Sequence, residues 1–168
     1  MFLNSQKAFT MIEMIAAIFV VNLGIMAVFS LLIQSTTFIN NTASNLTATY
    51  LAQEGIEIVR NIRDSNFLKM NQGEEASWND NLSVGADYYN FDYRSQSIPD
   101  NVNCSGQIYL QISNGYYACS PNPAVKFQRK IRINQISGDK MEVLVEVLWT
   151  ERGKNHNVSV QETLYRWY

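Results

Sequence analysis

The distribution of apolar and polar residues divides the chain into a helical first part and a strand-rich last part. From Phe9 to Gln53 the only charged side chain is Glu13, and the segment from Met14 to Ile33 is almost wholly apolar. About 20 such residues form a helix of roughly 30 Å, enough to cross the hydrocarbon core of a bilayer. Because a soluble core rarely needs a long helix that is apolar on all sides, the pattern predicts a membrane-spanning helix rather than a buried one.

The same helix is expected to continue beyond the membrane segment. Apolar side chains recur at three- and four-residue spacing as far as Ile62, which is typical of an amphipathic helix. No Pro or Gly interrupts the chain between Ile25 and Glu54. The pattern therefore predicts one helix from Thr10 to about Arg63, whose second half packs on a sheet. We interpret its charged residues as a solvated face, with Arg60 and Asp64 one turn apart.

The last third of the chain alternates apolar and polar residues with a period of two, which is typical of half-buried strands. One such run contains Ile131, the next contains Val145, and Ser137-Gly138-Asp139 lies between them. A three-residue loop there would pair Ile131 with Val145 and Lys130 with Glu146, so that apolar and charged faces both match. The two runs therefore predict a β-hairpin in this register.

Further strands are predicted on either side of this hairpin. An alternating run ends near Asn114-Gly115, and a final run extends from Val158 to Trp167. The final run slips out of phase between Val160 and Thr163, which predicts a bulge. The segment from Ser65 to Pro99 is predicted to be a long connection with short strands. Its aromatic side chains more often anchor a loop to a core than form a ligand surface.

Two features at the start of the chain point to chemistry. Met1 to Ala8 is short, polar and basic, and it ends in a small residue. It lacks the apolar core that a secretory signal places before its cleavage site, so any cleavage here must precede the apolar run. Glu13 is a carboxylate within an apolar helix, which costs about 2.5–3.5 kcal/mol at the bilayer centre. Glu13 either marks a partner or lies near the headgroups, where this cost is small.

In these features the chain resembles the type IV prepilins and the related pseudopilins. The resemblance is carried by the short basic leader, by Ala8, and by Phe9-Thr10-Met11-Ile12-Glu13-Met14 at the opening of the apolar helix. It implies that a membrane prepilin peptidase cuts between Ala8 and Phe9 and that the new amino terminus is methylated. Family members usually have Gly where Ala8 stands, and many carry a Pro in the membrane helix that this chain lacks.

The resemblance and the position of Glu13 together suggest how subunits assemble. After the cut, Glu13 lies one helical turn from the α-amine of Phe9, and the carboxylate of one subunit can meet the amine of its neighbour. A charge pair is strong at low dielectric, so assembly would be favoured in one axial register. The implied partners are other pilin subunits, the prepilin peptidase, an inner-membrane assembly platform and, before assembly, the lipid bilayer.

The architecture that the resemblance implies is an α+β fold. A long amino-terminal α-helix, transmembrane in its first half, packs on a carboxyl-terminal antiparallel β-sheet, and the periodicities independently allow this. The expected parts are a leader (1–8), a transmembrane and assembly half of the helix (9–35) and an exported globular domain (36–168). Lys7 precedes the apolar run and no Lys or Arg follows until Arg60, so the amino end is expected to be cytoplasmic. The exported domain would reach the cell surface on assembly.

The cysteine spacing fits export. Cys104 and Cys119 enclose a loop of about 15 residues, and in an oxidising compartment a disulfide between them is the default. A structural zinc site needs four ligands, so two cysteines alone do not indicate a metal. The only histidine, His156, has no evident partners. A calcium site would need a carboxylate cluster, which is not evident in the scattered acidic residues Asp80, Asp87 and Asp92.

The composition excludes some functions and leaves two open. The formal net charge is −2, and loss of Lys7 with the leader makes it −3, so there is no basic footprint for nucleic acid. No triad, paired carboxylates or phosphate loop is evident, so neither an enzyme nor a cofactor is predicted. The favoured interpretation is a type IV pilin-like structural subunit, more similar to a minor pilin or pseudopilin than to a principal fibre subunit. The alternative is a signal-anchored surface receptor or adhesin that is never cleaved.

Overall fold

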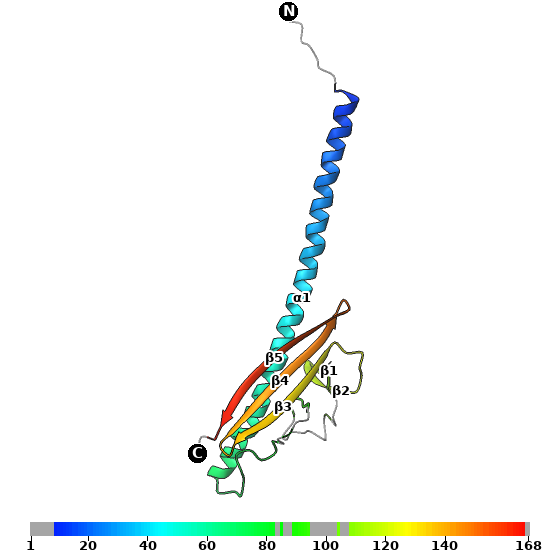
Figure 1. The fold of residues 1–168 in the computed structure, drawn as a ribbon. Helices are drawn as coiled ribbons and strands as arrows, with labels where there is room; N and C mark the ends of the chain where they lie inside the picture. Colours follow the sequence, from blue (N-terminus) through cyan, green and yellow to red (C-terminus); the bar gives the residue numbers. More distant parts are fainter. Residues whose placement is uncertain (1–8, 83–84, 86–88, 95–103, 105–107, 167–168) are drawn as a thin grey trace, which may run out of the picture. The chain divides into compact units, whose positions relative to one another are not determined.

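The computed structural model describes residues 9–82, 85, 89–94, 104 and 108–166. In these residues α1 packs on one antiparallel sheet in the order β2-β1-β3-β4-β5 (Figure 1). The predicted α+β class, with a long helix on a carboxyl-terminal sheet, is therefore confirmed. The elements are α1 (Met11–Asn71), β1 (Tyr109–Ser113), β2 (Tyr116–Ser120), β3 (Phe127–Ser137), β4 (Lys140–Glu151) and β5 (Lys154–Tyr165).

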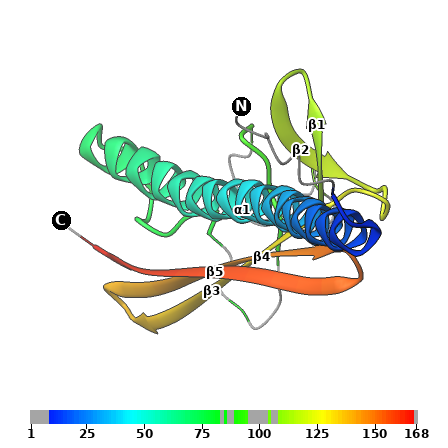
Figure 2. The same ribbon diagram turned by 90° about the horizontal axis from the view of Figure 1, so that it is seen from above.

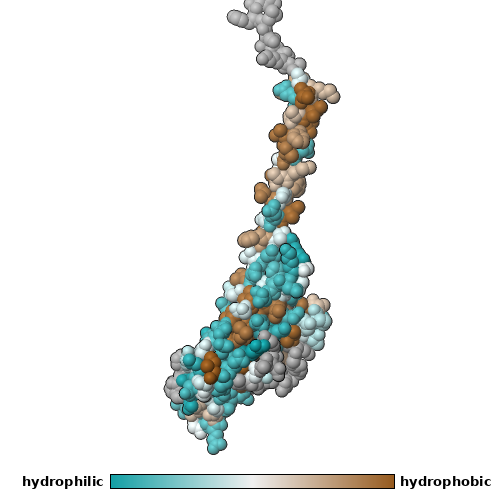
Figure 3. Space-filling model, in the orientation of Figure 1, coloured by the Kyte–Doolittle hydropathy of each residue, from teal (hydrophilic) through white to brown (hydrophobic). Residues whose placement is uncertain are grey.

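Two compact units share the helix. The first, Met1–Ala43, contains the apolar half of α1, and the second, Ser44–Tyr168, contains the rest of α1 and the whole sheet. Figure 3 shows the difference in hydropathy: the first half of the helix is mostly hydrophobic, whereas the second unit presents many hydrophilic side chains. The apolar surface of α1 and its sheet-packing surface therefore belong to different halves of the helix.

The ends of α1 follow from local sequence. Thr10 caps the start, because its Oγ1 accepts a hydrogen bond from the backbone N–H of Glu13 at 3.3 Å. After the last turn, Gly73 has a φ of 82°, the left-handed conformation that closes a helix in a Schellman motif. The helix therefore ends at Asn71, about two turns later than the predicted end near Arg63.

The core lies between the second half of α1 and the inner face of the sheet. Figure 2 shows this half of the helix on one side of β3, β4 and β5. Gly55 allows the close approach, because a Cβ at this position would lie 2.9 Å from Cγ1 of Val145. Glycine is therefore needed at this position for packing, which the periodicity of the sequence does not reveal. The buried apolar residues of α1 are Ala48, Leu51, Ala52, Ile56, Val59, Ile62 and Phe67, and the buried strand residues include Ile131, Ile133, Val143, Val145 and Val147.

The β3–β4 hairpin has the predicted register. Ile131 pairs with Val145, and Lys130 pairs with Glu146. The loop differs from the prediction, because Ser137 pairs with Lys140 and a register shift occurs just before Ser137. A two-residue turn and a bulge thus replace the predicted three-residue loop. The bulge adds one residue to the two-residue turn, so the connection is as long as the predicted three-residue loop. The register of the paired strands is therefore the same.

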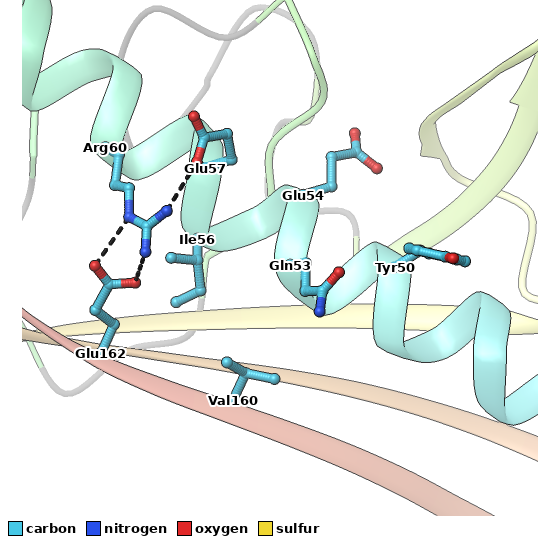
Figure 4. Close-up of a pocket in the computed structure, with 8 residues that line it drawn as sticks. All are labelled: Tyr50, Gln53, Glu54, Ile56, Glu57, Arg60, Val160 and Glu162. Carbon is cyan, nitrogen blue, oxygen red and sulfur yellow. Dashed lines mark hydrogen bonds and ion pairs between the residues drawn. The ribbon is translucent and has the colours of Figure 1, made fainter.

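The bulge predicted in the last strand is wrong. β5 starts at Lys154 and pairs with β4 over its whole length without a register shift. The apparent slip is caused by Glu162, which lies on the same side of the strand as Val160 and points to α1 (Figure 4). Its carboxylate binds Arg60 there, at 2.6 Å. The charged residue on the core-facing side interrupts the apolar alternation, although the strand itself has no bulge.

The connections around β1 and β2 complete the sheet. The predicted strand before Asn114-Gly115 is β1, and both turn residues have positive φ, 52° and 84°, as a type I′ hairpin requires. The returning strand, β2, was not predicted. Between α1 and β1, Trp78 and Phe91 are buried in the core, which confirms that these aromatic residues anchor the connection. Its described residues contain an isolated bridge between Tyr89 and Ile131.

Candidate functional site

The start of α1 contains the residues that the family resemblance singled out. The side chain of Phe9 is 77% exposed, while Ala8 and the rest of the leader lie outside the described residues. Glu13 is exposed in the first turn of α1, where the positive end of the helix dipole favours a carboxylate. The spacing of Thr10 and Glu13 is that of a capping box, so stabilisation of the helix start is a second candidate role for Glu13 beside its predicted role in assembly.

The first unit exposes a continuous apolar surface. Among the described residues, α1 is the one helix long and apolar enough to cross a membrane. Its large apolar side chains are exposed from Phe9 to Ile39 in the chain. A soluble surface rarely carries an apolar area of this extent, so lipid or other apolar helices are its natural surroundings.

A disulfide joins Cys104 to Cys119 in β2. The Cα atoms are 5.2 Å apart, and Cys104 is fully buried in the hydrophobic core. The bond therefore ties the connection before β1 to an edge of the sheet. It is also the feature of this domain that depends on an oxidising compartment.

Removal of this disulfide tests its contribution to stability. We expect Cys119→Ser to lower the free energy of unfolding by about 3 kcal/mol at most, because a closed loop of about 15 residues restricts the unfolded chain by this amount. Urea unfolding of the variant beside the wild type measures the loss. Alkylation of native wild-type protein without reductant is the control, and quantitative labelling of both thiols would contradict the bond.

Arg129 forms a buried charge centre in the second unit. Its side chain is fully buried on the core-facing side of β3. The guanidinium donates to the carbonyl of Leu51 at 3.2 Å and to the carbonyl of Phe91, and it lies 3.6 Å from the carboxylate of Glu54. Its Nε donates to the Oδ1 of Asn90 at 3.3 Å. One arginine thus joins α1, β3 and the segment around Phe91.

Burial disfavours the charged form of both Arg129 and Glu54. Burial lowers the pKa of Arg129, and the nearby carboxylates of Glu54 and Asp92 partly oppose this change. Burial raises the pKa of Glu54, while Arg129 partly lowers it. The guanidinium keeps its charge because the ordinary pKa of arginine is far above neutral. The centre is a structural ion pair, and its signal in the sequence was an arginine at a core position of an alternating strand.

An open groove lies between α1 and β5, with a volume of about 550 Å³ (Figure 4). Arg60 lies at one end, where Nε and Nη2 donate to the two carboxylate oxygens of Glu162 at 2.9 and 2.6 Å, and Nη1 donates to Glu57 at 3.0 Å. Hydrogen bonding to Glu162 raises the pKa of Arg60. The residues that line the groove are Tyr50, Gln53, Glu54, Ile56, Glu57, Arg60, Val160 and Glu162.

The predicted solvated face of α1 is therefore only partly correct. Arg60 binds Glu57 on α1 and Glu162 on β5, and the ion pair that Asp64 forms is with its neighbour Arg63 at 2.7 Å. The interaction with Glu162 could not be predicted from helix spacing, because the two residues are 102 positions apart in the sequence.

The other residues considered as ligands are not brought together. His156 stacks on Trp149 with ring centres 5.3 Å apart. Asp92 is buried and pairs with Arg94 at 2.6 Å, and Asp80 accepts the N–H of Ser77 at 2.6 Å. Asp87 lies outside the described residues. Among the residues that the structure describes, no group of three or more His, Cys, Asp or Glu could hold a metal ion.

Comparisons with known proteins add no assignment to these sites. No protein-family model matches the chain, and no match was found among curated proteins or solved structures. The candidate function therefore depends on the residues and geometry described above.

Proposed function

We propose that this protein is a structural subunit of a type IV pilus or a related pseudopilus, processed between Ala8 and Phe9 by a prepilin peptidase. The observation that carries the proposal is the segment from Phe9 to Met14, which opens a long apolar run in which Glu13 is the only charged residue as far as Gln53. This combination of a basic leader, a small residue and an early carboxylate is the basis of the resemblance to prepilins.

The geometry of the helix is compatible with two successive environments. Its first half exposes apolar side chains on all sides, which lipid covers before assembly and the helices of neighbouring subunits cover afterwards. Its second half is fixed to the sheet by a buried stripe and needs no such cover. One helix thus provides an anchor, an assembly surface and the support of a globular domain.

Orientation follows from the charges and agrees with the disulfide. Lys7 at the leader favours a cytoplasmic amino end, which places the sheet domain outside the cytoplasm. The bond between Cys104 and Cys119 is suited to that compartment. In this orientation the domain is exported before assembly and displayed on the pilus afterwards.

Processing is the direct test of the proposal. We expect the assembled protein to start at methylated Phe9, because this cut places a free amine one turn from Glu13. Intact-mass analysis of membrane-extracted and assembled protein measures the loss of residues 1–8 and the gain of one methyl group. Ala8→Gly, which restores the residue usual in the family, is the control and should be processed at least as fully. An assembled chain that keeps the leader would favour the anchored receptor or adhesin.

A further inference from the structure

The outer edge of β5 is long and regular. β5 is the last strand in the sheet order, and it pairs with β4 from Lys154 to Tyr165 without a shift. The described part of the chain places no strand on its other side. β5 contains no Pro, and its only charged residues are Lys154 and Glu162. Natural proteins usually protect such edges with bulges, prolines or several charges, so this edge is suited to accept another strand.

The groove beside α1 lies where the side chains of an added strand would go. Val160 and Glu162 point from β5 towards α1, and they form the floor of the groove with Tyr50 and Gln53 on the helix side (Figure 4). Neighbouring strands are about 4.8 Å apart, and side chains on one face lie beside each other. Alternate side chains of an added strand would therefore enter the groove, next to Val160 and Glu162.

The lining of the groove defines the chemistry of that strand. Val160 offers an apolar neighbour, and Glu162 two positions later provides a carboxylate whose oxygens also accept from Arg60. Glu57 on α1 is exposed and adds a second carboxylate, whereas Arg60 is the one cation among the lining residues. Even when Glu54 is counted as the partner of Arg129, the groove has two carboxylates, Glu57 and Glu162, for the one cation Arg60. An opposite charge across a strand pair is favourable and a like charge is unfavourable.

We propose that the free edge of β5 binds an extended segment of a partner protein by strand addition. The segment has an apolar residue and a basic residue two positions apart, which lie beside Val160 and Glu162. The backbone ladder supplies affinity, and the groove supplies the preference for a basic side chain. This interaction surface is additional to the helix-mediated assembly.

A second copy of the chain is the other occupant to consider. Two β5 strands related by a two-fold axis at Val158 would place Lys154 opposite Glu162. That pairing turns the two sheet domains in opposite directions. Chains that enter one bilayer by the same end carry their domains in the same direction, so a partner segment fits the edge better. This choice between occupants rests on the proposed function.

Binding of designed peptides to the full chain in detergent tests the proposal. The probe is a seven-residue peptide of alternating Thr and Val with one Lys at the second inward position. Its matched partner has Glu in place of Lys, and a third version has every backbone amide methylated. We expect the Lys peptide to bind roughly tenfold more tightly than the Glu peptide. Hydrogen exchange should slow at β5, and the methylated peptide should not bind.

A charge variant separates the groove from general electrostatic attraction. Glu57→Gln should reduce the preference for the Lys peptide about threefold, while the same change at the exposed Glu74 should leave it unchanged. Equal affinity for the Lys and Glu peptides, binding of the methylated peptide, or protection at β2 instead of β5 would overturn the proposal. Self-association of the chain with protection at β5 would assign the edge to a second copy instead.

Discussion

Arg129→Met is expected to lower the free energy of unfolding of the second unit by about 3–5 kcal/mol, the usual cost of removing one partner from a buried ion pair. The substitution leaves the buried carbonyls of Leu51 and Phe91 without their donor and Glu54 without its cation. Methionine keeps much of the side-chain volume, so most of the loss should come from these polar groups rather than from a cavity.

The measurement is urea unfolding of the full chain in detergent, with tryptophan fluorescence as the signal. Lys130→Met is the matched control, because it also replaces a basic residue with methionine. Lys130 is the next residue of β3, and its side chain lies on the opposite face of the sheet. That change should alter stability by no more than about 0.5 kcal/mol. If Arg129→Met loses less than about 1 kcal/mol, the guanidinium is not the centre that holds α1, β3 and the segment around Phe91 together.

Much of the fold is readable from the sequence because its signals are local and repeated. The register of Ile131 with Val145 follows from two alternating runs and a short loop, which leave few pairings with matching faces. The long helix is likewise readable, since neither Pro nor Gly interrupts the chain between Ile25 and Glu54. Local patterns thus determined the helix and the central hairpin.

Most of the features that were missed depend on contacts distant in sequence. Glu162 breaks the apolar alternation of β5 because it binds Arg60 on α1, and this partner is visible only after folding. Arg129 stands at a core position for the same reason. The strand β2 lacks a clear alternation, and its place is given by the turn at Asn114-Gly115 and by the disulfide at Cys119. Sequence alone could not distinguish these residues from breaks in the pattern.

The two candidate sites differ in the same way. The segment from Phe9 to Glu13 is contiguous, so its spacing can be read directly, and the structure adds the cap by Thr10. The groove at β5 combines α1 with a strand some 100 residues later, and no motif marks it. Its charge balance and its free edge become evident only when Glu57 and Glu162 are brought to the same place.

Glu13→Ala should strongly reduce incorporation into a pilus or pseudopilus without preventing membrane insertion. Insertion should persist because removal of a charge lowers the cost of placing the helix in lipid. Cleavage should also persist, since the leader, Ala8 and Phe9 are unchanged. Assembly should fall because the amine of Phe9 in a neighbouring subunit loses its partner in a low-dielectric setting. Glu13→Gln should fail in the same direction but less severely, because it keeps a hydrogen-bond acceptor without the charge.

The cap on α1 provides the control for this prediction. Thr10→Ala removes the side-chain oxygen that accepts the N–H of Glu13, whereas Glu13→Ala keeps that N–H and removes only the carboxylate. If Glu13 acts by stabilising the helix start, both variants should assemble equally poorly. If it pairs with a neighbour's amine, Glu13→Ala should be much the more severe. Co-purification with sheared fibres or the assembly platform, normalised to membrane levels, measures the difference, and wild-type incorporation of Glu13→Ala would refute the pairing.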